Sequence, residues 1–367
     1  MLFEPSEINE MHLVNRFVRS ATWEGMATDE GEVTPALIKT MEDLARGGVG
    51  LIITGHAYIL PEGQAGPWQL GIYKDELLDG LKTMTDAVHR AQGKIVAQLA
   101  HAGHFAADYL TKEPPRVVSD YEGLAATPRH ELTKKDIGEL IDAYAAAARR
   151  AKAAGFDGVQ LHSAHGYLLS QFLSPVFNRR NDGYGGAIGN RVRVHLEICH
   201  AVREAVGADY PVLIKINCED FTENGFTPED SLKACKLLSQ AGIDAFEMSG
   251  GLLTGGKLSP SRSGINSPEK EAYFSQYAKS FKKEINTPLI LVGGIRSLDV
   301  AKGLIETGTA DYISLCRPLI REPGLVNRWK SGETSPATCK SDNLCFRPAL
   351  SGKGIYCVVE EQEKAKA

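Results

Sequence analysis

The sequence predicts an α/β fold, a (β/α)8 TIM barrel, and two observations support this prediction. Short apolar runs alternate with helix-like stretches about eight times along the chain, which is the repeat of a (β/α)8 barrel. Four similar glycine-containing turns also connect a helix-like stretch to the apolar run that follows it. They begin at Gly47, Gly155, Gly242 and Gly308. A doubly wound sheet is the alternative; it is disfavoured because no Gly-x-Gly-x-x-Gly motif follows an early strand.

The barrel strands are expected where the apolar runs lie, because each run is short and bounded by turn residues. The glycine in each turn is expected to end the preceding helix with a positive φ and to lead the chain into the next strand. The expected strands are residues 17–20, 49–54, 94–99, 158–161, 212–217, 245–248, 289–292 and 312–315.

Helix starts are marked by hydroxyl side chains that can cap the first turn. Proline at the first helical position strengthens the signal, because its fixed φ suits a helix start. Such pairs are Thr34-Pro35, Thr227-Pro228 and Ser267-Pro268. Two further pairs, Thr133 with Asp136 and Thr227 with Asp230, resemble capping boxes in which Asp replaces the usual Glu.

Composition narrows the class of protein. The chain has 367 residues, 43% of them hydrophobic, and a formal net charge of −5, as in an ordinary globular enzyme. It has no long basic run, so we expect no nucleic-acid partner. No signal-peptide pattern opens the sequence, and no apolar stretch approaches the roughly 20 residues that span a bilayer, so we expect no membrane partner. Seven scattered cysteines favour a reducing, cytoplasmic location.

The domain organisation is expected to be simple. Residues 1–335 are expected to form one barrel domain, since no composition break divides them. Residues 336–367 are expected to form a short C-terminal extension that carries three cysteines, and its charged end, residues 360–367, is expected to fray.

Residues that carry chemistry follow the expected strands, where a barrel places its active site. His162, His165 and Tyr167 follow the fourth strand and lie within six residues of one another. They offer hydrogen-bond donors for an oxygen and an acid for a developing carbanion. The pair Gly293-Gly294 follows the seventh strand and Arg317 the eighth, a combination that can hold a phosphate through backbone amides and a charge-assisted contact.

Long ordered segments resemble the Old Yellow Enzyme family of FMN-dependent NAD(P)H oxidoreductases, or ene-reductases, over essentially the whole barrel. The family consists of (β/α)8 barrels with FMN at the carboxyl face of the strands. The matching segments are GGVGLIIT (47–54), GIYKDE (71–76), AQLAHAG (97–103), GFDGVQLHSAHGYLLSQFLSP (155–175), NRRNDGYGG (178–186) and LVGGIRS (291–297).

The resemblance implies a cofactor site. Ser20, Ala21 and Thr22 would line the flavin, Gly55 would pack near its ring, and Gln98 would bind the pyrimidine edge. Lys215 stands where the family usually has arginine, near N1 and C2=O of the flavin. The residues implied for the ribityl phosphate are Ser249, Gly251, Gly293, Gly294, Cys316 and Arg317.

The resemblance also implies a reaction. NAD(P)H would pass hydride to flavin N5, and the hydride would then reach the activated C=C bond of a small-molecule α,β-unsaturated carbonyl compound. His162 and His165 would bind the substrate carbonyl or the nicotinamide amide, and Tyr167 would give the proton. The physiological alkene and the choice between NADH and NADPH are not indicated. The family's usual dimers and tetramers imply a homo-oligomer.

Three positions depart from the family pattern. Trp23 stands where Cys or Thr usually lies beside the flavin, so it cannot donate a thiol or hydroxyl proton there and is expected to narrow the substrate site. Cys316 replaces a usual glycine before Arg317 and is expected to crowd the phosphate. Lys215 keeps the positive charge of the usual arginine, but it lacks the planar guanidinium that can donate two parallel hydrogen bonds.

The cysteines of the extension leave an alternative open. Iron–sulfur relatives of the family hold a [4Fe–4S] cluster in this region with four cysteines. Here Asp342 stands at about the second position, between Cys339 and Cys345, and Cys357 follows. Three reduced thiols are the favoured interpretation, and an iron–sulfur cluster or zinc held by these four residues is the alternative.

Other interpretations of the site remain. His162 and His165 could be metal ligands, and Tyr167 could simply pack. Lys215 could pair with Asp220, or serve as the Schiff-base lysine of a phosphate-binding lyase or aldolase on the same barrel. Arg179 and Arg180 could bind an acidic substrate, although a structural salt bridge is favoured. The chain could also be a flavin subunit that a protein partner reduces.

Overall fold

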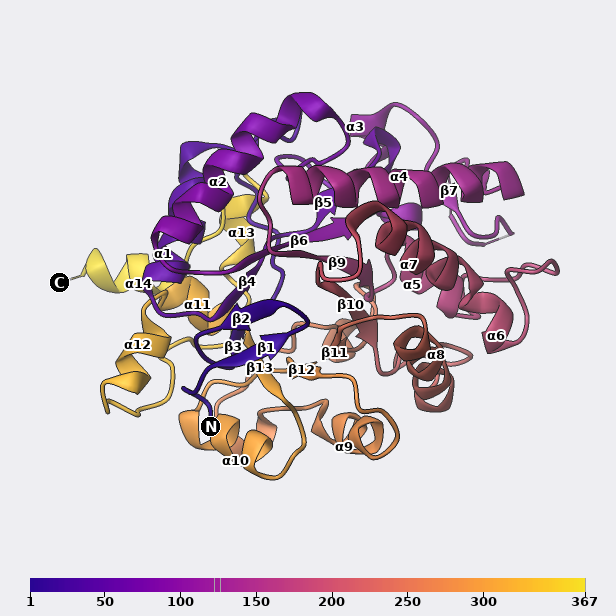
Figure 1. The fold of residues 1–367 in the computed structure, drawn as a ribbon. Coiled ribbons are helices and arrows are strands. Elements are labelled where there is room, and N and C mark those ends of the chain that lie inside the picture. The colour runs from indigo at the N-terminus through magenta and orange to yellow at the C-terminus, as the bar shows by residue number, and fades with distance from the viewer. Residues whose placement is uncertain (122, 126, 367) are drawn as a thin grey trace.

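The centre of the molecule is a closed sheet of parallel strands, surrounded by helices (Figure 1). The computed structural model describes residues 1–121, 123–125 and 127–366. Each strand pairs with the next along the chain, and the last pairs with the first, which closes the ring and confirms the predicted (β/α)8 barrel. The barrel strands are β3 (Phe17–Arg19), β4 (Leu51–Ile53), β6 (Ile95–Ala100), β9 (Gly158–Ser163), β10 (Val212–Asn217), β11 (Ala245–Ser249), β12 (Leu289–Leu291) and β13 (Tyr312–Leu315).

Every residue of these eight strands is buried, because each strand faces the barrel interior on one side and the helices on the other. Each of the predicted apolar runs overlaps one of them, and no end differs by more than two residues. A short extra strand, β5 (Ala57–Tyr58), pairs with β6 just beyond the end of β4.

The outer ring is formed by the longer helices. They are α1 (Pro35–Arg46), α2 (Leu78–Arg90), α4 (Lys134–Ala153), α7 (Arg193–Val206), α8 (Pro228–Gln240), α9 (Ser275–Glu284) and α10 (Leu298–Glu306). Three of the predicted turn glycines carry the expected positive φ, 83° at Gly155, 90° at Gly242 and 64° at Gly308, whereas in the first turn the positive φ falls on Gly48 and Gly47 stays helical. A residue with Cβ would be strained there, so these glycines fix where a helix ends and a strand begins.

The predicted caps are present at three helix starts. Thr34 accepts a hydrogen bond from the Leu37 amide, and Thr133 and Asp136 form a reciprocal capping box at α4. Thr227 accepts from the Asp230 amide, but the Asp230 carboxylate pairs with Arg191 instead of returning to the N-cap.

The prediction that an α-helix starts at Ser267-Pro268 was wrong. A single 3-10 turn, Pro268–Lys270, follows, and Ser267 makes no side-chain cap hydrogen bond. Proline favours a helical first φ, but the backbone leaves the helical conformation after one turn, since Glu271 is extended and Ala272 has a φ of 49°.

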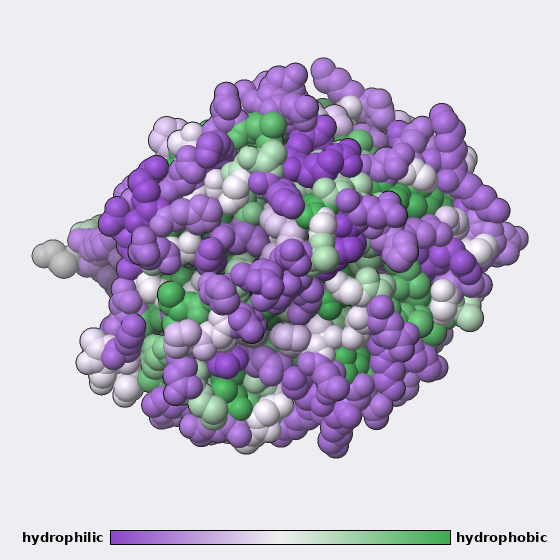
Figure 2. Space-filling view, viewed as in Figure 1, coloured by the Kyte–Doolittle hydropathy of each residue, from purple (hydrophilic) through white to green (hydrophobic). Residues whose placement is uncertain are grey.

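The amino end of the barrel is closed by the hairpin of β1 (Ser6–Ile8) and β2 (Met11–Leu13), which lies across the barrel in Figure 1. Ile8, Met11 and Leu13 pack with Leu51, Ile290 and other side chains from the barrel interior. The same face is largely hydrophilic on its surface, with small scattered apolar areas (Figure 2).

Shorter strands and helices lie in the remaining segments of the chain. They are β7 (Arg116–Val117), β8 (His130–Glu131), α3 (Asp108–Thr111), α5 (Leu168–Leu173), α6 (Ile188–Arg191), α11 (Arg317–Arg321), α12 (Leu325–Lys330), α13 (Phe346–Ala349) and α14 (Val358–Lys364). Helix α14 corrects the expectation that the charged end frays, because Glu363 pairs with Arg321 and holds the helix to α11. Among the described residues, no helix is long and apolar enough to cross a membrane.

Candidate active site

A cavity of about 430 Å³ opens at the carboxyl ends of the barrel strands. Its volume lies in the range of small-molecule and cofactor sites. Side chains from the ends of all eight barrel strands or the loops that follow them line it, which is where a barrel of this kind places its chemistry. Residues predicted for the site that line this cavity are Ser20, Ala21, Thr22, Trp23, Gln98, His162, His165, Tyr167, Lys215, Ser249, Gly294, Cys316 and Arg317.

The structure brings His162, His165 and Tyr167 together on one side of the cavity. His162 lies in β9, and Tyr167 is the N-cap residue of α5. The ring of His162 is 4.6 Å from that of Tyr167 and 5.3 Å from that of His165, centroid to centroid. His165 has a φ of 66°, and its amide donates to the Asn217 side chain, which holds this unusual backbone conformation.

The two histidines are neutral at pH 7. Burial, reinforced by nearby Lys215 and the other imidazoles, lowers the pKa of both His162 and His165 well below the ordinary value. Nε2 of His165 lies 2.7 Å from the Ser249 hydroxyl. Nδ1 of His162 is buried without a hydrogen-bond partner among the described residues, so this ring has hydrogen-bonding capacity left for a ligand.

Tyr167 contacts His56, which follows a different barrel strand, β4. Its hydroxyl lies 3.2 Å from Nε2 of His56, and Nδ1 of His56 lies 2.7 Å from the amide nitrogen of Gln69. Burial raises the pKa of Tyr167, so the phenol keeps its proton at neutral pH.

A buried ion pair lies at the base of the cavity. Nζ of Lys215 is 3.4 Å from the Glu247 carboxylate and donates to the Ser20 hydroxyl at 2.7 Å. The suggestion that Lys215 pairs with Asp220 was wrong, because the Asp220 carboxylate instead accepts hydrogen bonds from the Asn217 side chain and from the Phe226 amide. Register explains the difference, because Lys215 and Glu247 are directly paired on neighbouring strands.

Glu247 is the centre of a wider polar network. Its carboxylate accepts hydrogen bonds from Ser20, Ser314 and Gln160, and Gln160 in turn accepts from Gln98. Burial opposes ionisation of Glu247, but Lys215 and these donors outweigh it and hold the pKa of the carboxyl below its usual range. The network therefore fixes Gln98 and Lys215 and partly neutralises the lysine charge.

The far end of the cavity contains Arg317, Cys316 and Gly294. The Arg317 guanidinium is buried and donates to the Asn343 side chain at 2.8 Å. Sγ of Cys316 lies 3.1 Å from the Thr22 hydroxyl. At Gly294, with φ of 73°, a Cβ atom would come within 2.7 Å of the Tyr273 ring, so the close approach of backbone and ring requires glycine.

Three predicted residues lie behind the cavity wall as the structure describes it. The Gly55 amide donates to Glu24, and a Cβ there would meet the Glu24 carboxylate at 2.2 Å. A Cβ on Gly251 would meet the Leu258 carbonyl at 2.2 Å, and Gly293 faces Phe274 and Tyr273. These glycines allow neighbouring segments to pack closely.

The C-terminal extension forms part of the cavity wall. Phe346 and Leu350 line the cavity, and Trp23 packs beside them against Cys345 and Ala349. Trp23 therefore narrows the mouth together with the extension.

The cysteines of the extension make different immediate contacts. Cys345 belongs to the apolar cluster beside Trp23, Cys339 accepts a hydrogen bond from the Ser341 amide, and the Asp342 carboxylate accepts from the Leu344 amide. Cys357 lies near Arg321. Within the described residues, no three His, Cys, Asp or Glu side chains form a group that could hold a metal ion.

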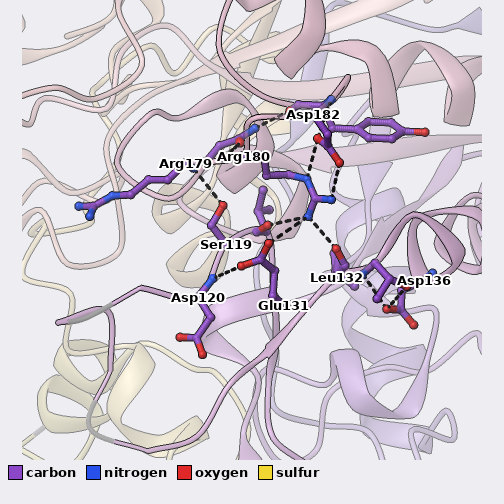
Figure 3. Close-up of polar contacts among 12 residues, drawn as sticks. Ser119, Asp120, Glu131, Leu132, Asp136, Arg179, Arg180 and Asp182 are labelled. Atoms are coloured by element: carbon purple, nitrogen blue, oxygen red, sulfur yellow. Dashed lines mark hydrogen bonds and ion pairs between the residues drawn. The ribbon is translucent and has the colours of Figure 1, made fainter.

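Arg180 has a structural role, as Figure 3 shows. Its guanidinium pairs with Asp182 at 2.7 Å and donates to the carbonyls of Val118 and Leu132. Arg179 points away from this cluster, and its guanidinium lies 3.4 Å from the Tyr121 ring centroid. Arg180 therefore joins two loops, in agreement with the favoured interpretation.

Sequence reasoning did not assign roles to several residues of the site. His56 follows β4 and could have been selected by the strand-end rule that identified His162. Glu247, Gln160 and Ser314 lie within strands, where an isolated polar residue in an apolar run was the available signal. Nothing in the sequence pointed to Gln69, Phe346 or Leu350.

The chain is similar to known proteins in both sequence and fold. A sequence profile of the NADH:flavin oxidoreductase / NADH oxidase family matches residues 1–335, which confirms the resemblance drawn from the sequence. A metal reductase of Desulforamulus reducens is 36% identical over 371 residues, covering 100% of this chain and 54% of that protein. An NADPH dehydrogenase of a Geobacillus species is 35% identical over 324 residues, covering 88% of this chain and 92% of that protein.

The solved structure of a 2-naphthoyl-CoA reductase in complex with 2-naphthoyl-CoA superposes with a TM-score of 0.89 at 27% identity. The match covers 98% of this chain and 56% of that one. The chain thus spans about half the length of this reductase and of the metal reductase, and nearly the whole length of the NADPH dehydrogenase.

Proposed function

Because the chain belongs to the NADH:flavin oxidoreductase / NADH oxidase family, we propose that it is an FMN-dependent oxidoreductase that reduces small molecules with NAD(P)H. We further propose that its substrate is an α,β-unsaturated carbonyl compound, whose activated C=C bond receives the hydride. The observation that carries this proposal is the grouping of His162, His165 and Tyr167 on one wall of the cavity.

FMN fits the groups that the cavity presents. When bound, FMN supplies the hydride transfer that amino-acid side chains cannot perform. A buried lysine, an oriented glutamine amide and a buried arginine match its polar ring edge and its phosphate. Within the cavity wall, the residues proposed to hold it are Ser20, Ala21, Thr22, Gln98, Lys215, Ser249, Gly294, Cys316 and Arg317. Gly55, Gly251 and Gly293 would act by letting neighbouring backbone pack closely.

The chain's own residues supply orientation and a proton. His162 has an unpartnered ring nitrogen, so with His165 it can bind the substrate carbonyl oxygen and stabilise the negative charge that builds there. Because both rings are neutral, each can donate only one hydrogen bond, and the charge is stabilised without proton transfer. Tyr167 keeps its proton until the α-carbon accepts it.

The mouth of the cavity favours a substrate with an apolar body. Tyr109, Leu253 and Leu350 line it and are 69%, 48% and 69% exposed, respectively, although side chains of this size are usually covered. Trp23 and Phe346 continue the apolar surface inward. We therefore propose an alkene with an aromatic or alicyclic body rather than a charged one.

A lyase or aldolase that uses Lys215 is not favoured by these contacts. A Schiff base needs a neutral amine with room for a carbonyl carbon. Here the amine of Lys215 donates to Ser20 and lies against the Glu247 carboxylate, so these contacts already occupy it.

The proposal is tested with the purified protein and FMN. A yellow protein that is bleached anaerobically by NADH or NADPH, and recolours when a cyclic enone is added, supports it. A preparation that takes up no added FMN contradicts the cofactor assignment, and a bleached enzyme that leaves the alkene intact contradicts the substrate class.

The roles of the histidines need a binding measurement. His162→Ala and His165→Ala should each weaken binding of a phenolic ligand by about tenfold or more, because each removes a hydrogen bond to a charged oxygen. His200→Gln, at an exposed position on α7, is the matched control. Unchanged affinity in both alanine variants contradicts the assignment.

A further inference from the structure

His56 occupies a part of the cavity wall that the reaction described above does not use. It follows β4 and precedes β5, so the barrel fixes its backbone on both sides. Its ring is stacked near that of His162, with 6.2 Å between centroids and an interplanar angle of 16°. Its Nε2 is 3.2 Å from the Tyr167 hydroxyl, which has no other hydrogen-bond partner among the described residues.

The orientation of the Gln69 amide is determined by two backbone groups. The Ala65 amide can only donate, and it contacts Oε1 of Gln69 at 2.7 Å. The His56 carbonyl can only accept, and it contacts Nε2 of Gln69 at 3.0 Å. The same nitrogen lies 2.7 Å from Nδ1 of His56, so its second hydrogen points at the imidazole.

This orientation decides which nitrogen of His56 carries the proton. Nδ1 accepts a hydrogen bond from Gln69 and is therefore unprotonated. Burial lowers the pKa of His56 to about 4, so at neutral pH the ring has a single N–H. That N–H is on Nε2 and points at the Tyr167 oxygen. The tyrosine thus accepts from His56 and keeps its own hydroxyl proton free for another acceptor.

We propose that His56, held as its Nε2–H tautomer by Gln69, is a positioning residue that presents the Tyr167 proton to the substrate and stabilises the phenolate left behind. The proposal rests on the proposed function, in which Tyr167 is the proton donor. In that step the O–H bond of Tyr167 breaks and a C–H bond forms at the α-carbon, while the hydride comes from NAD(P)H. The electron pair stays on the phenolate oxygen, and solvent water later returns a proton to it.

A buried tyrosine that gives up its proton needs a hydrogen-bond donor that stabilises the phenolate. Burial raises the pKa of Tyr167 above its ordinary value, because a phenolate in this wall loses its hydration. The Nε2–H of His56 replaces part of that hydration at no cost in reorganisation, since Gln69 already fixes the ring. The neutral state of His56 matters too, because a cationic ring would donate from both nitrogens and lose the hydrogen bond from Gln69.

The tautomer can be observed directly in the purified protein. Nitrogen-15 NMR of protein labelled at histidine should show His56 as the Nε2–H form from about pH 5 to about pH 9, with the signal identified by its loss in His56→Gln. Gln69→Leu should remove the preference by leaving Nδ1 without its donor. A wild-type Nδ1–H tautomer, or titration near the ordinary histidine pKa, overturns the proposal.

Kinetics test the function of the hydrogen bond. His56→Leu should slow alkene reduction about ten- to a hundredfold, the value of a hydrogen bond to a charged group, and leave flavin reduction by NAD(P)H unchanged. His56→Gln places an amide donor at a similar distance and should recover most of the loss. An equally slow His56→Gln enzyme overturns the proposal.

A double substitution separates this proposal from the proposed function. In a Tyr167→Phe background, His56→Leu should have no further effect on alkene reduction, because the group that it supports is gone. Equal losses in both backgrounds overturn the role of His56. If Tyr167→Phe reduces alkenes at the wild-type rate, the proton-donor role itself is wrong, whereas loss in Tyr167→Phe without loss in His56→Leu contradicts only the role of His56.

Discussion

Lys215 and Glu247 are paired in register on β10 and β11, with 3.4 Å between the ammonium nitrogen and the carboxylate oxygen at the base of the cavity. On its other side, Lys215 is paired in register with His162. The charge that would face the cofactor is thus balanced by a buried carboxylate. This relationship gives the first prediction.

Glu247→Gln should leave Lys215 as an uncompensated buried cation. The free energy of unfolding should fall by about 3–5 kcal/mol, as for other broken buried pairs, and urea denaturation measures it. In the FMN-bound protein, the two-electron reduction potential should rise by about 30 mV or more, because the unpaired cation favours the more negative reduced cofactor. Adding Lys215→Met should recover part of the stability and reverse the rise in potential. A potential that stays constant in Glu247→Gln contradicts the placement of Lys215 beside the cofactor.

Acid should destabilise the fold through its buried histidines. Burial lowers the pKa of His101 and of His195 to about 3, whereas the unfolded chain titrates near its ordinary value of about 6.5. Between these limits the unfolded state binds more protons, so stability falls as pH falls, by up to about 1.4 kcal/mol per pH unit for each histidine.

Denaturation between pH 7 and pH 4, a window of about three units, measures this slope. His101→Gln with His195→Gln should reduce the slope, whatever the double substitution does to stability at neutral pH, while His56, His162 and His165 continue to contribute to it. If the double variant keeps the wild-type slope, His101 and His195 do not cause the loss of stability in acid.

Trp23 should limit the size of the substrate. Trp23→Ala opens the mouth between β3 and the C-terminal extension, and the ratio of kcat/KM for a bulky enone to that for a small one should rise by roughly tenfold. Trp23→Phe is the control that keeps an aromatic wall. An unchanged ratio in Trp23→Ala indicates that the substrate does not approach this side.

Arg180 should stabilise the loops beside the site. Arg180→Ala removes a salt bridge to Asp182 and two backbone hydrogen bonds, to Val118 and Leu132, and should cost about 2–4 kcal/mol of unfolding free energy. Arg179→Ala, the neighbouring control, loses only a contact with the Tyr121 ring and should cost about 1 kcal/mol or less. Equal effects of the two substitutions on Tm would contradict the assigned role of Arg180 (Figure 3).

Local signals made the fold predictable. Apolar runs, turn glycines and capping hydroxyls each act over a few residues, so the sequence indicated the eight barrel strands and the starts of α1, α4 and α8. The failure at Ser267-Pro268 has the same cause, since a cap signal covers only the first turn and does not show that the backbone leaves the helical conformation at Glu271. Strand ends also indicated His162, His165 and Tyr167, because every barrel gathers these ends on one face.

Partners within the site were decided by tertiary structure. The sequence determined which chemical groups stand at the strand ends, but not that Lys215 meets Glu247 rather than Asp220, which depends on strand register. It did not reveal that His56 meets Tyr167, 111 residues away, or that the C-terminal extension supplies Phe346 to the cavity wall. Closing a barrel brings together residues far apart in the chain, and only the packing of the whole ring fixes which of them touch.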